Sequence, residues 1–492
     1  MKQRLKILKL LIISSIFLVP GMMFGLTNVS GSISSNTTWT AEGNPYVVTG
    51  SITIDTGITL TVEAGVIVKL QTNRSIIVSD SASLIVNGTS GSPVYFTSYK
   101  DDTIGGDTNG DGSGSTPNWG DWGYIGNGAI GTGRAIQMSY SEVRYGGIDS
   151  SSDFGAIHLD DGIVTLDHTT IYKSRKWGVN VDNVDLTITH SLVDTCYDKG
   201  ILFSSTDNYV TITNTTVQNC YQQGFYVSSD HIIFTDNTAI NNGSADYDAI
   251  YLNSTNWTSP PTGNSVTGNY LNWIRMHGTV TASMTLPAQA VYYGNLTIDT
   301  GVTLTLAPGV IWKASSPYLY PFVVSDDASF IVNGTESQPV YITSAADDTV
   351  GGDSNGDGGA TTPARGNWER IGNASAGSNR TIQMSYCEVR YGGDYSDFAA
   401  IHLQDGNIVL DHTTIADSEF HGVYALYGDL TLTNCVIDNC FAGYGVYFSG
   451  TGNAVSITDT IAQNCGRQGF YLNSDNITFN NNQAINNGSA DY

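Results

Sequence analysis

The residues best suited to chemistry in this sequence lie in two nearly identical runs of aspartate, asparagine and glycine. DDTIGGDTNGDG spans Asp101–Gly112, and DDTVGGDSNGDG spans Asp347–Gly358. Each run contains an Asp-x-Asn-x-Asp-Gly pattern, which places three oxygen-bearing side chains at alternate positions before a glycine that permits a sharp turn. Carboxylates this close repel one another unless a cation neutralises them, and calcium accepts about six to eight oxygen ligands in irregular geometry. The pattern therefore predicts a calcium site in each run.

The predicted ligands are the same in both runs, since two leading aspartates can close the shell that the alternating residues begin. The candidate metal ligands are Asp101, Asp102, Asp107, Asn109 and Asp111 in the first run, and Asp347, Asp348, Asp353, Asn355 and Asp357 in the second. The last position of an EF-hand loop would be Asn118 or Ala364 rather than Glu, and no helical pattern flanks either run, so an EF-hand is excluded. A solvated loop of turn-forming residues is the alternative.

Both runs belong to a long internal repeat. GSITIDTGITLTVEAGVIVKL (Gly50–Leu70) returns as GNLTIDTGVTLTLAPGVIWKA (Gly294–Ala314), and RAIQMSYSEVRYGG returns as RTIQMSYCEVRYGG. We predict two tandem copies, residues 26–275 and 276–492. Both reach the motif NNGSADY, where the first copy continues into DAIYLNSTNW and the chain ends in the second. Because a terminal coil normally needs a polar cap, we expect the second copy to be truncated and the native protein to extend further.

A shorter period lies within each copy. Equivalent apolar positions recur every 22 to 25 residues: Ile171, Val193, Val217 and Ala239 in the first copy, and Ile415, Ile437, Ala462 and Ala484 in the second. Each unit has short alternating strands separated by polar kinks and a glycine. Only seven of the 45 acidic residues are Glu, and Asp disfavours helices, so the composition also indicates an all-β fold. A unit this short cannot bury its own apolar face, so the pattern predicts a solenoid of stacked coils.

Two polar columns follow the same period. One contains His168, His190, Asn214 and Asp236, and in the second copy His412, Asn434, Asp459 and Asn481; the other contains Ser174, Cys196, Cys220 and Asn242, and then Ser418, Cys440, Cys465 and Asn487. Coils stacked about 4.8 Å apart would let such side chains form hydrogen bonds along the solenoid axis. We predict structural or solvated roles for the histidines, including His158 and His402.

With these features, the chain resembles right-handed parallel β-helix proteins of the pectate-lyase-like superfamily over nearly all of its mature length. The start of each copy (ITIDTGITLTVEAGVIVKL, then LIVNGTSGSPVYFTS, the acidic run and GDWGYI in the first) is similar to a module of large secreted bacterial and archaeal β-helix proteins. The resemblance implies an all-β, right-handed, single-stranded parallel β-helix at the cell surface or outside the cell. In that module the acidic run is a projecting loop. The resemblance brings no known reaction with it.

The N-terminus predicts export. Four basic residues at positions 2–9 precede the apolar run Leu10–Val19, which favours a signal peptide over residues 1–25, although an uncleaved anchor is the alternative. We expect a secreted, extracellular or cell-surface protein with no membrane insertion after signal removal. A net charge of -25 argues against nucleic acid as a partner, because acidic surfaces repel phosphates.

Candidates for catalysis are few. Asp160 and Asp161 have the look of a catalytic acid pair, but the second copy has Gln404 and Asp405 in their place. Lyases of the superfamily use an Arg or Lys as base, for which Arg144 and Arg390 are the candidates, but each lies two residues from a Glu, so an ion pair is the favoured role. The Asn-Thr-Asp, Gly-His-Gly and Arg-Ile-Lys motifs of inverting polygalacturonases do not occur in the sequence.

Aromatic side chains near the acidic runs could stack on sugar rings. The candidates for carbohydrate binding are Trp119, Trp122, Trp177 and Trp368, and Tyr197, Tyr221 and Phe225 recur near the turns of the coils. The alternative is that these rings cover the edges of the core.

Cysteines occupy one column on adjacent coils. Cys196 with Cys220, and Cys440 with Cys465, are candidates for disulfides, since export permits oxidation and neighbouring coils bring them within range. A stack of small buried thiols is the alternative.

Two classes of function remain. We predict a calcium-stabilised adhesive scaffold that binds a polysaccharide or cell-surface glycan and has no catalysis of its own. The alternative is a polysaccharide lyase or glycoside hydrolase.

Overall fold

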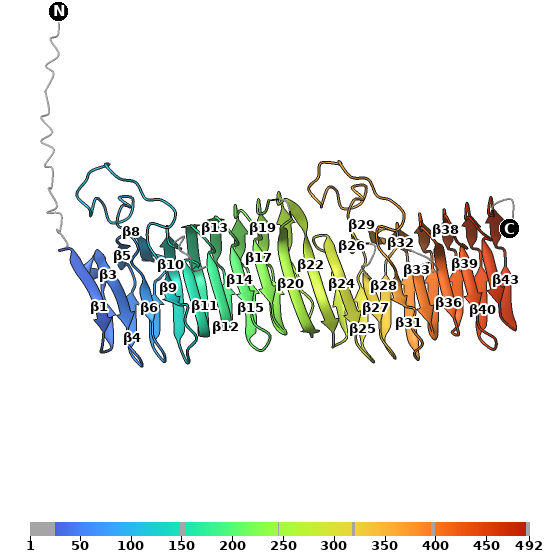
Figure 1. The fold of residues 1–492 in the computed structure, drawn as a ribbon, viewed down its shortest axis with the longest axis horizontal. Coiled ribbons are helices and arrows are strands. Elements are labelled where there is room, and N and C mark those ends of the chain that lie inside the picture. The colour runs from blue at the N-terminus through green and yellow to red at the C-terminus, as the bar shows by residue number, and fades with distance from the viewer. Residues whose placement is uncertain (1–24, 148–153, 245, 317–319, 395–398, 489–492) are drawn as a thin grey trace, which may run out of the picture.

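The computed structural model describes residues 25–147, 154–244, 246–316, 320–394 and 399–488. Every ladder between β-strands in this part of the chain is parallel, and the strands wind into one elongated solenoid from which both acidic runs project on the same side (Figure 1). A short 3-10 turn lies at Ala41–Gly43, and no helix among the described residues is long and apolar enough to cross a membrane. The predicted signal peptide lies outside the described residues, apart from Gly25.

The strands run from β1 (Thr27–Ile33) to β44 (Gln483–Ile485). Those that position the candidate sites in the first copy are β5 (Ile67–Leu70), β8 (Val94–Ser98), β9 (Ile125–Asn127), β10 (Ala135–Arg144), β11 (Ile157–Ser174), β12 (Val179–Thr189), β13 (Leu192–Cys196), β15 (Tyr209–Thr213), β16 (Thr216–Gln218), β20 (Asp248–Trp257) and β22 (Leu271–Val280). Their counterparts in the second copy include β26 (Ile311–Ala314), β29 (Val340–Ser344), β30 (Ile371–Asn373), β32 (Cys387–Arg390), β34 (Gly406–Asp411), β36 (His421–Leu426) and β37 (Leu430–Thr433). The strand that follows β22 at the junction is β24 (Tyr292–Ile298).

The register confirms the predicted period. In the first copy Ile171 pairs with Val193, Val193 with Val217, and Val217 with Ala239. In the second copy the pairs run in the same way from Ile415 to Ala484. The apolar residue of each coil therefore sits directly above that of the coil before.

Stacking of the coils builds one continuous core. Strands such as β15 alternate between buried and more accessible residues, so that the apolar side chains of every coil point inward. The largest of these include Trp122, Trp312 and Trp368, all fully buried. Burial of apolar surface contributes about 25 cal/mol per Å², and each coil gains it only from its neighbours.

The first polar column marks a corner of the solenoid. His168, His190, Asn214 and Asp236 have φ between 48° and 55°, in the left-handed region. Asn, Asp and His are the non-glycine residues most often found there, which explains why the column accepts only these types. The residue types in this column are therefore determined by the backbone conformation as well as by exposure to solvent.

The second column supplies hydrogen bonds along the axis, as predicted. The backbone N–H of Cys220 donates to Oδ1 of Asn242 (2.9 Å), and that of Asn242 donates to Oδ1 of Asn269 (2.8 Å). Asn487 accepts in the same way from Cys465 (2.9 Å). Buried amides thus satisfy backbone groups at a corner where the strand ladder is interrupted.

The two copies share one solenoid. The proposed boundary between residues 275 and 276 falls within β22, which pairs with β20 on one side and with β24 on the other. The core passes through this junction without interruption.

Candidate functional site

Each acidic run lies in a long loop at the same point of its copy. The first acidic loop, residues 99–124, connects β8 to β9, and the second acidic loop, residues 345–370, connects β29 to β30. Both loops rise from the same side of the solenoid, as Figure 1 shows. A loop can grow at this point because its two ends are held by neighbouring parallel ladders.

Three carboxylates meet in each loop. Oxygens of Asp102, Asp107 and Asp111 lie within 4.8 Å of one another, and so do those of Asp348, Asp353 and Asp357. Oδ1 of Asp102 and Oδ1 of Asp348 are buried without a hydrogen-bond partner among the described residues. Burial, followed by the charge of Asp353, raises the pKa of Asp348. These groups fit a hard divalent cation, which would neutralise the crowded charge and give the orphaned oxygens a partner.

Backbone N–H groups stabilise part of the carboxylate charge in each loop. Asp107 accepts hydrogen bonds from the N–H groups of Gly110 (2.8 Å) and Gly112 (2.9 Å). The amide nitrogen of Asn109 donates to Asp111 (3.0 Å), so a ligand role for Asn109 requires its oxygen to turn toward the carboxylates instead. Asn355 and Asp357 are arranged in the same way, at 2.9 Å.

The structure does not bring Asp101 or Asp347 into either group of carboxylates. Asp101 is fully buried at the base of the loop, where it accepts hydrogen bonds from Thr97 Oγ1 (2.6 Å) and from the backbone N–H of Thr103 (3.1 Å). Asp347 accepts from Thr343 Oγ1 (2.7 Å) in the second copy. The prediction that these two aspartates close the metal shell is therefore corrected: their oxygens are engaged in holding the loop to the solenoid.

A buried lysine lies under each acidic loop, and the sequence analysis missed both. Nζ of Lys69 donates to the carbonyl oxygens of Asp101 (3.0 Å) and Gly106 (2.6 Å). Lys313 makes the same two contacts with Asp347 (2.9 Å) and Gly352 (3.0 Å). Both lysines are fully buried, and burial lowers the pKa of each ammonium group, while nearby aspartates oppose the shift. The available signal was a lysine at the same place in two otherwise apolar strands, VIVKL and VIWKA.

The arginine candidates form the ion pairs favoured by the sequence. Arg144 Nε lies 2.7 Å from a carboxylate oxygen of Glu142, and Arg390 pairs with Glu388 in the same way. Neither guanidinium is therefore free to act as a base without giving up its partner.

The acid pair separates into two different environments. Asp161 accepts from the backbone N–H of Gly131 (3.0 Å), and its counterpart Asp405 accepts from that of Gly377 (3.0 Å), so this position holds a turn in both copies. Asp160 lies 3.9 Å from Nε2 of His158. Burial, together with the charges of Asp182 and Asp161, raises the pKa of Asp160.

Two of the four tryptophan candidates cannot contact a sugar. Trp122 and Trp368 are fully buried, and their indole N–H groups donate to the carbonyl oxygens of Arg144 (2.7 Å) and Arg390 (3.0 Å). They are core residues, because each fills the solenoid interior beneath its acidic loop. Phe225 is also fully buried, whereas Trp119 and Trp177 are partly exposed.

The accessible rings form a strip beside the first acidic loop. Tyr197 and Tyr221 are 51% and 60% exposed and stack at 5.8 Å on adjacent coils. Trp119 meets Tyr197 edge-on at 6.2 Å, and the guanidinium of Arg175 lies 4.7 Å from the centre of the Tyr197 ring. We call Trp119, Arg175, Tyr197 and Tyr221 the aromatic strip.

The cysteines of the second column are free thiols in the structure. Cys196, Cys220, Cys440 and Cys465 are all buried in the described core. Burial and the neighbouring Cys220 raise the pKa of Cys196 well above its usual value. This arrangement matches the alternative of stacked thiols, and the two disulfides stay predictions for the oxidised protein.

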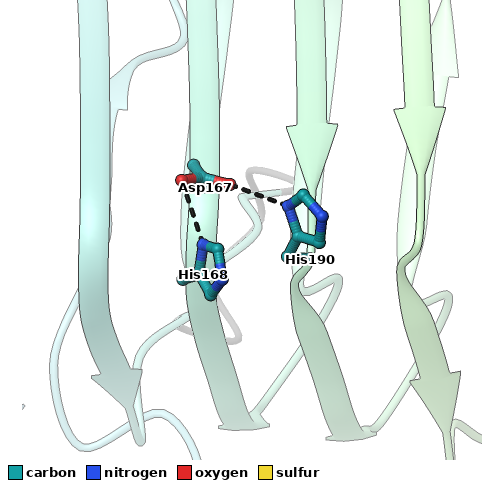
Figure 2. A group of neighbouring side chains, drawn as sticks. All are labelled: Asp167, His168 and His190. Atoms are coloured by element: carbon teal, nitrogen blue, oxygen red, sulfur yellow. Dashed lines mark hydrogen bonds and ion pairs between the residues drawn. The ribbon is translucent and has the colours of Figure 1, made fainter. Parts of the chain in front are cut away.

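The histidine column gathers a further group that the sequence analysis did not single out. His168 and His190 lie on either side of Asp167, each with Nδ1 turned toward a different carboxylate oxygen (Figure 2). The column itself was predicted, but Asp167 was missed. The Asp-His pair that occurs at 167–168 and again at 411–412 was the available signal.

Comparison with family models decides the class of the protein. The right-handed β-helix region matches residues 131–286 and 371–491, and the pectate-lyase-like β-helix domain matches residues 31–159 and 278–400. The chain belongs to the right-handed β-helix family. The handedness and the superfamily implied by the sequence resemblance are thereby confirmed for this β-helix.

Similarity to solved structures of other β-helix proteins is weak. The catalytic domain of a GH87 α-1,3-glucanase in complex with tetrasaccharides is 11% identical with a TM-score of 0.21, and the alignment covers 80% of this chain and 64% of that domain. The A-module of the Azotobacter vinelandii mannuronan C-5 epimerase AlgE4 is 10% identical with a TM-score of 0.14, covering 86% and 88%. These scores are too low to bear on the activity of this β-helix. No curated protein matches its sequence.

Proposed function

We propose that this protein is a secreted or cell-surface scaffold that binds a polysaccharide or cell-surface glycan, stabilises its acidic loops with calcium and has no catalysis of its own. The observation that carries the proposal is the aromatic strip, where Tyr197 and Tyr221 expose more than half of their surface beside Arg175. Flat rings combine apolar faces with polar edges, which suits them to the mixed surface of a sugar.

The ion pairs that the arginine side chains form with carboxylates favour a scaffold over a lyase. The arginines retained in both copies are held in ion pairs: Arg144 with Glu142, Arg390 with Glu388, Arg134 with Asp80, and Arg380 with Asp326. A lyase or hydrolase remains the alternative, and Asp160 is the acid that favours it, because burial and the charges of Asp182 and Asp161 raise the pKa of this carboxyl. The second copy has Gln404 in its place.

Glycan binding is tested with variants of the strip. Purified protein is screened against uronic-acid and neutral polysaccharides, and the best binder is titrated. Replacing Tyr197 and Tyr221 together by Ala should weaken binding by about five- to 150-fold, since each ring contributes about 0.5–1.5 kcal/mol. Tyr209→Ala is the matched control, because Tyr209 is 62% exposed at the start of β15 and stacks on His231 away from the strip. Equal binding by the double variant and the control would contradict the proposal.

Calcium binding is tested by calorimetry after treatment with EDTA. We expect two sites per chain, with Asp107→Asn and Asp353→Asn each removing one of them, and no effect of Asp207→Asn, an exposed aspartate outside both loops. An absence of binding, or binding unchanged in the variant that lacks both Asp107 and Asp353, would refute the calcium part without touching the glycan part.

Export is tested with the full chain expressed in a secreting host. We expect extracellular protein whose intact mass corresponds to cleavage near Gly25. Retention of the uncleaved chain inside the cell would contradict this proposal.

A further inference from the structure

A compact group of metal-binding side chains lies on the lateral surface of the first copy, away from the aromatic strip. Asp167 and His168 belong to β11, and His190 follows β12 on the next coil (Figure 2). Nδ1 of His168 lies 3.0 Å from Oδ2 of Asp167, and Nδ1 of His190 lies 3.2 Å from Oδ1. One ligand atom from each of the three residues falls within 4.8 Å of the other two.

The solenoid holds these side chains in place. Asp167 pairs in register with Thr189, whose hydroxyl donates to its Oδ1 (2.6 Å). Both histidines occupy the left-handed corner, so their rings project in the same direction on successive coils and stack at 4.7 Å. Tyr140 stacks under His168 at 4.3 Å. A metal ion would therefore meet ligands whose conformations are already restricted, which lowers the entropic cost of binding.

We propose that Asp167, His168 and His190 bind one divalent transition-metal ion of the zinc or copper type. In a tetrahedral site with bonds of about 2.05 Å, neighbouring ligand atoms are separated by about 3.3 Å. Each Nδ1 lies at a similar distance from a different oxygen of Asp167, so a carboxylate that binds through both oxygens would meet both imidazoles. Two imidazoles and a carboxylate suit zinc, copper or nickel, whereas the oxygen-rich acidic loops suit calcium. The proposal is independent of the proposed function.

The ion would take the place of the Nδ1 protons. Each imidazole then carries its proton on Nε2 and offers the Nδ1 lone pair to the metal, while the carboxylate of Asp167 supplies the negative charge. The two rings are 39% and 52% exposed and border a shallow depression of about 550 Å³. The remaining coordination positions are consequently accessible to water or to an oxygen of a bound ligand.

The second copy is an internal control. Asp411 and His412 lie 2.9 Å apart, and Tyr386 stacks on His412 at 4.6 Å, as in the first copy. Asn434 stands where the first copy has His190, with the same left-handed backbone. An amide oxygen is a much poorer ligand than imidazole for these ions. The second copy therefore has the first two ligands in the same arrangement but lacks the second imidazole.

The test uses the full chain with calcium present to fill the acidic loops. Zinc is titrated by calorimetry, and copper(II) is examined by electron paramagnetic resonance for coupling to two imidazole nitrogens. His190→Asn reproduces the second copy and should weaken zinc binding at least about tenfold without loss of fold, because Asn already occupies this corner on other coils. Asn434→His should create a second site. His231→Asn is the control, because His231 lies on the same lateral sheet but at the opposite end of its strand, four positions before Thr235, which stacks in the column of Asp167.

The outcomes separate cleanly. Binding of about one zinc per chain, lost in His190→Asn, kept in His231→Asn and doubled in Asn434→His, supports the site. Zinc binding that His190→Asn leaves unchanged, or an absence of binding to the wild-type chain, overturns it. If Asn434→His folds but gains no site, the geometric argument is wrong even if the first copy binds.

Discussion

The two copies share the contacts that hold the acidic loops and the large side chains beneath them, and they differ at several other positions along the coils. Lys69 and Lys313 hold the bases of the acidic loops through equivalent contacts. Trp122 and Trp368 fill the same place in the core. Residues that are the same in both copies therefore report mainly what a coil needs in order to fold.

Three differences between the copies are informative by contrast, and at one of them the second copy carries a buried side chain, His421. His190 is replaced by Asn434, and Asp160 by Gln404. Trp177 is replaced by His421, whose position is assured because Ser174 Oγ and Ser418 Oγ donate to the carbonyl oxygens of Trp177 (2.6 Å) and His421 (2.7 Å). Activities specific to one copy must depend on such positions.

The acidic loops differ in their surroundings rather than in their sequences. The second loop packs on the end of the first copy, where the backbone N–H of Asn272 donates to the carbonyl oxygen of Ser354 (2.8 Å). Gly356 approaches the carbonyl of Tyr270 so closely that an added Cβ would lie 2.0 Å from it. The equivalent Gly110 has open space around it.

The largest expected effect tests what the copies share. Trp122→Ala and Trp368→Ala should each destabilise the surrounding coils by about 3–5 kcal/mol, because both leave a large cavity and an unpaired carbonyl. Hydrogen exchange resolved by peptide measures this locally, which a single melting temperature cannot do in a solenoid. If a variant keeps its protection from exchange but loses glycan binding, that tryptophan takes part in glycan binding after all.

Acid should destabilise the second copy more than the first, because only the second has a buried histidine at position 421. Burial, together with Arg467 and His402, lowers the pKa of His421 to about 3, and its Nδ1 accepts a hydrogen bond from the backbone N–H of Tyr444 (2.9 Å). An unfolded histidine takes up a proton below about pH 6.5 whereas the folded one does not, so stability falls as the pH drops toward 3, by roughly 3 kcal/mol at about pH 4.

Hydrogen exchange at neutral and acid pH should therefore show the coils around β36 opening first on acidification. His421→Gln should reduce that loss, and His412→Asn, at an exposed corner, should not. Equal acid sensitivity of the wild type and His421→Gln would show that burial of this histidine does not control the acid response.

The smallest expected effect concerns the loops. Both Gly110 and Gly356 have positive φ, so alanine at either position carries a strain of about 1–2 kcal/mol. Gly356→Ala should in addition push the second loop off Tyr270 and expose it to limited proteolysis, whereas Gly110→Ala should leave the first loop as sensitive as before. Similar cleavage of both variants would mean that contact with the preceding coil does not protect the second loop.

The fold was predictable because its signal is periodic. The apolar position of Ile171 recurs on successive coils, and this recurrence predicted the register. The Asn, Asp and His residues of the corner column follow from the left-handed backbone there. Exposure was harder to predict: Trp122 lies beside an acidic loop in sequence, yet its ring points into the core. The stacking of His168 and His190 was predicted, but Asp167 was missed because it lies one position before the column, and its contact with His190 depends on the direction in which that carboxylate points.

The central claim, a glycan-binding scaffold without turnover, is tested most directly by following the best-bound polysaccharide during prolonged incubation with the protein. Reducing ends and the ultraviolet absorbance of unsaturated uronates are measured with calcium and with EDTA. We predict saturable binding and no new chain ends under either condition. New ends that accumulate with protein concentration and disappear in an Asp160→Asn variant would contradict the account and identify an enzyme.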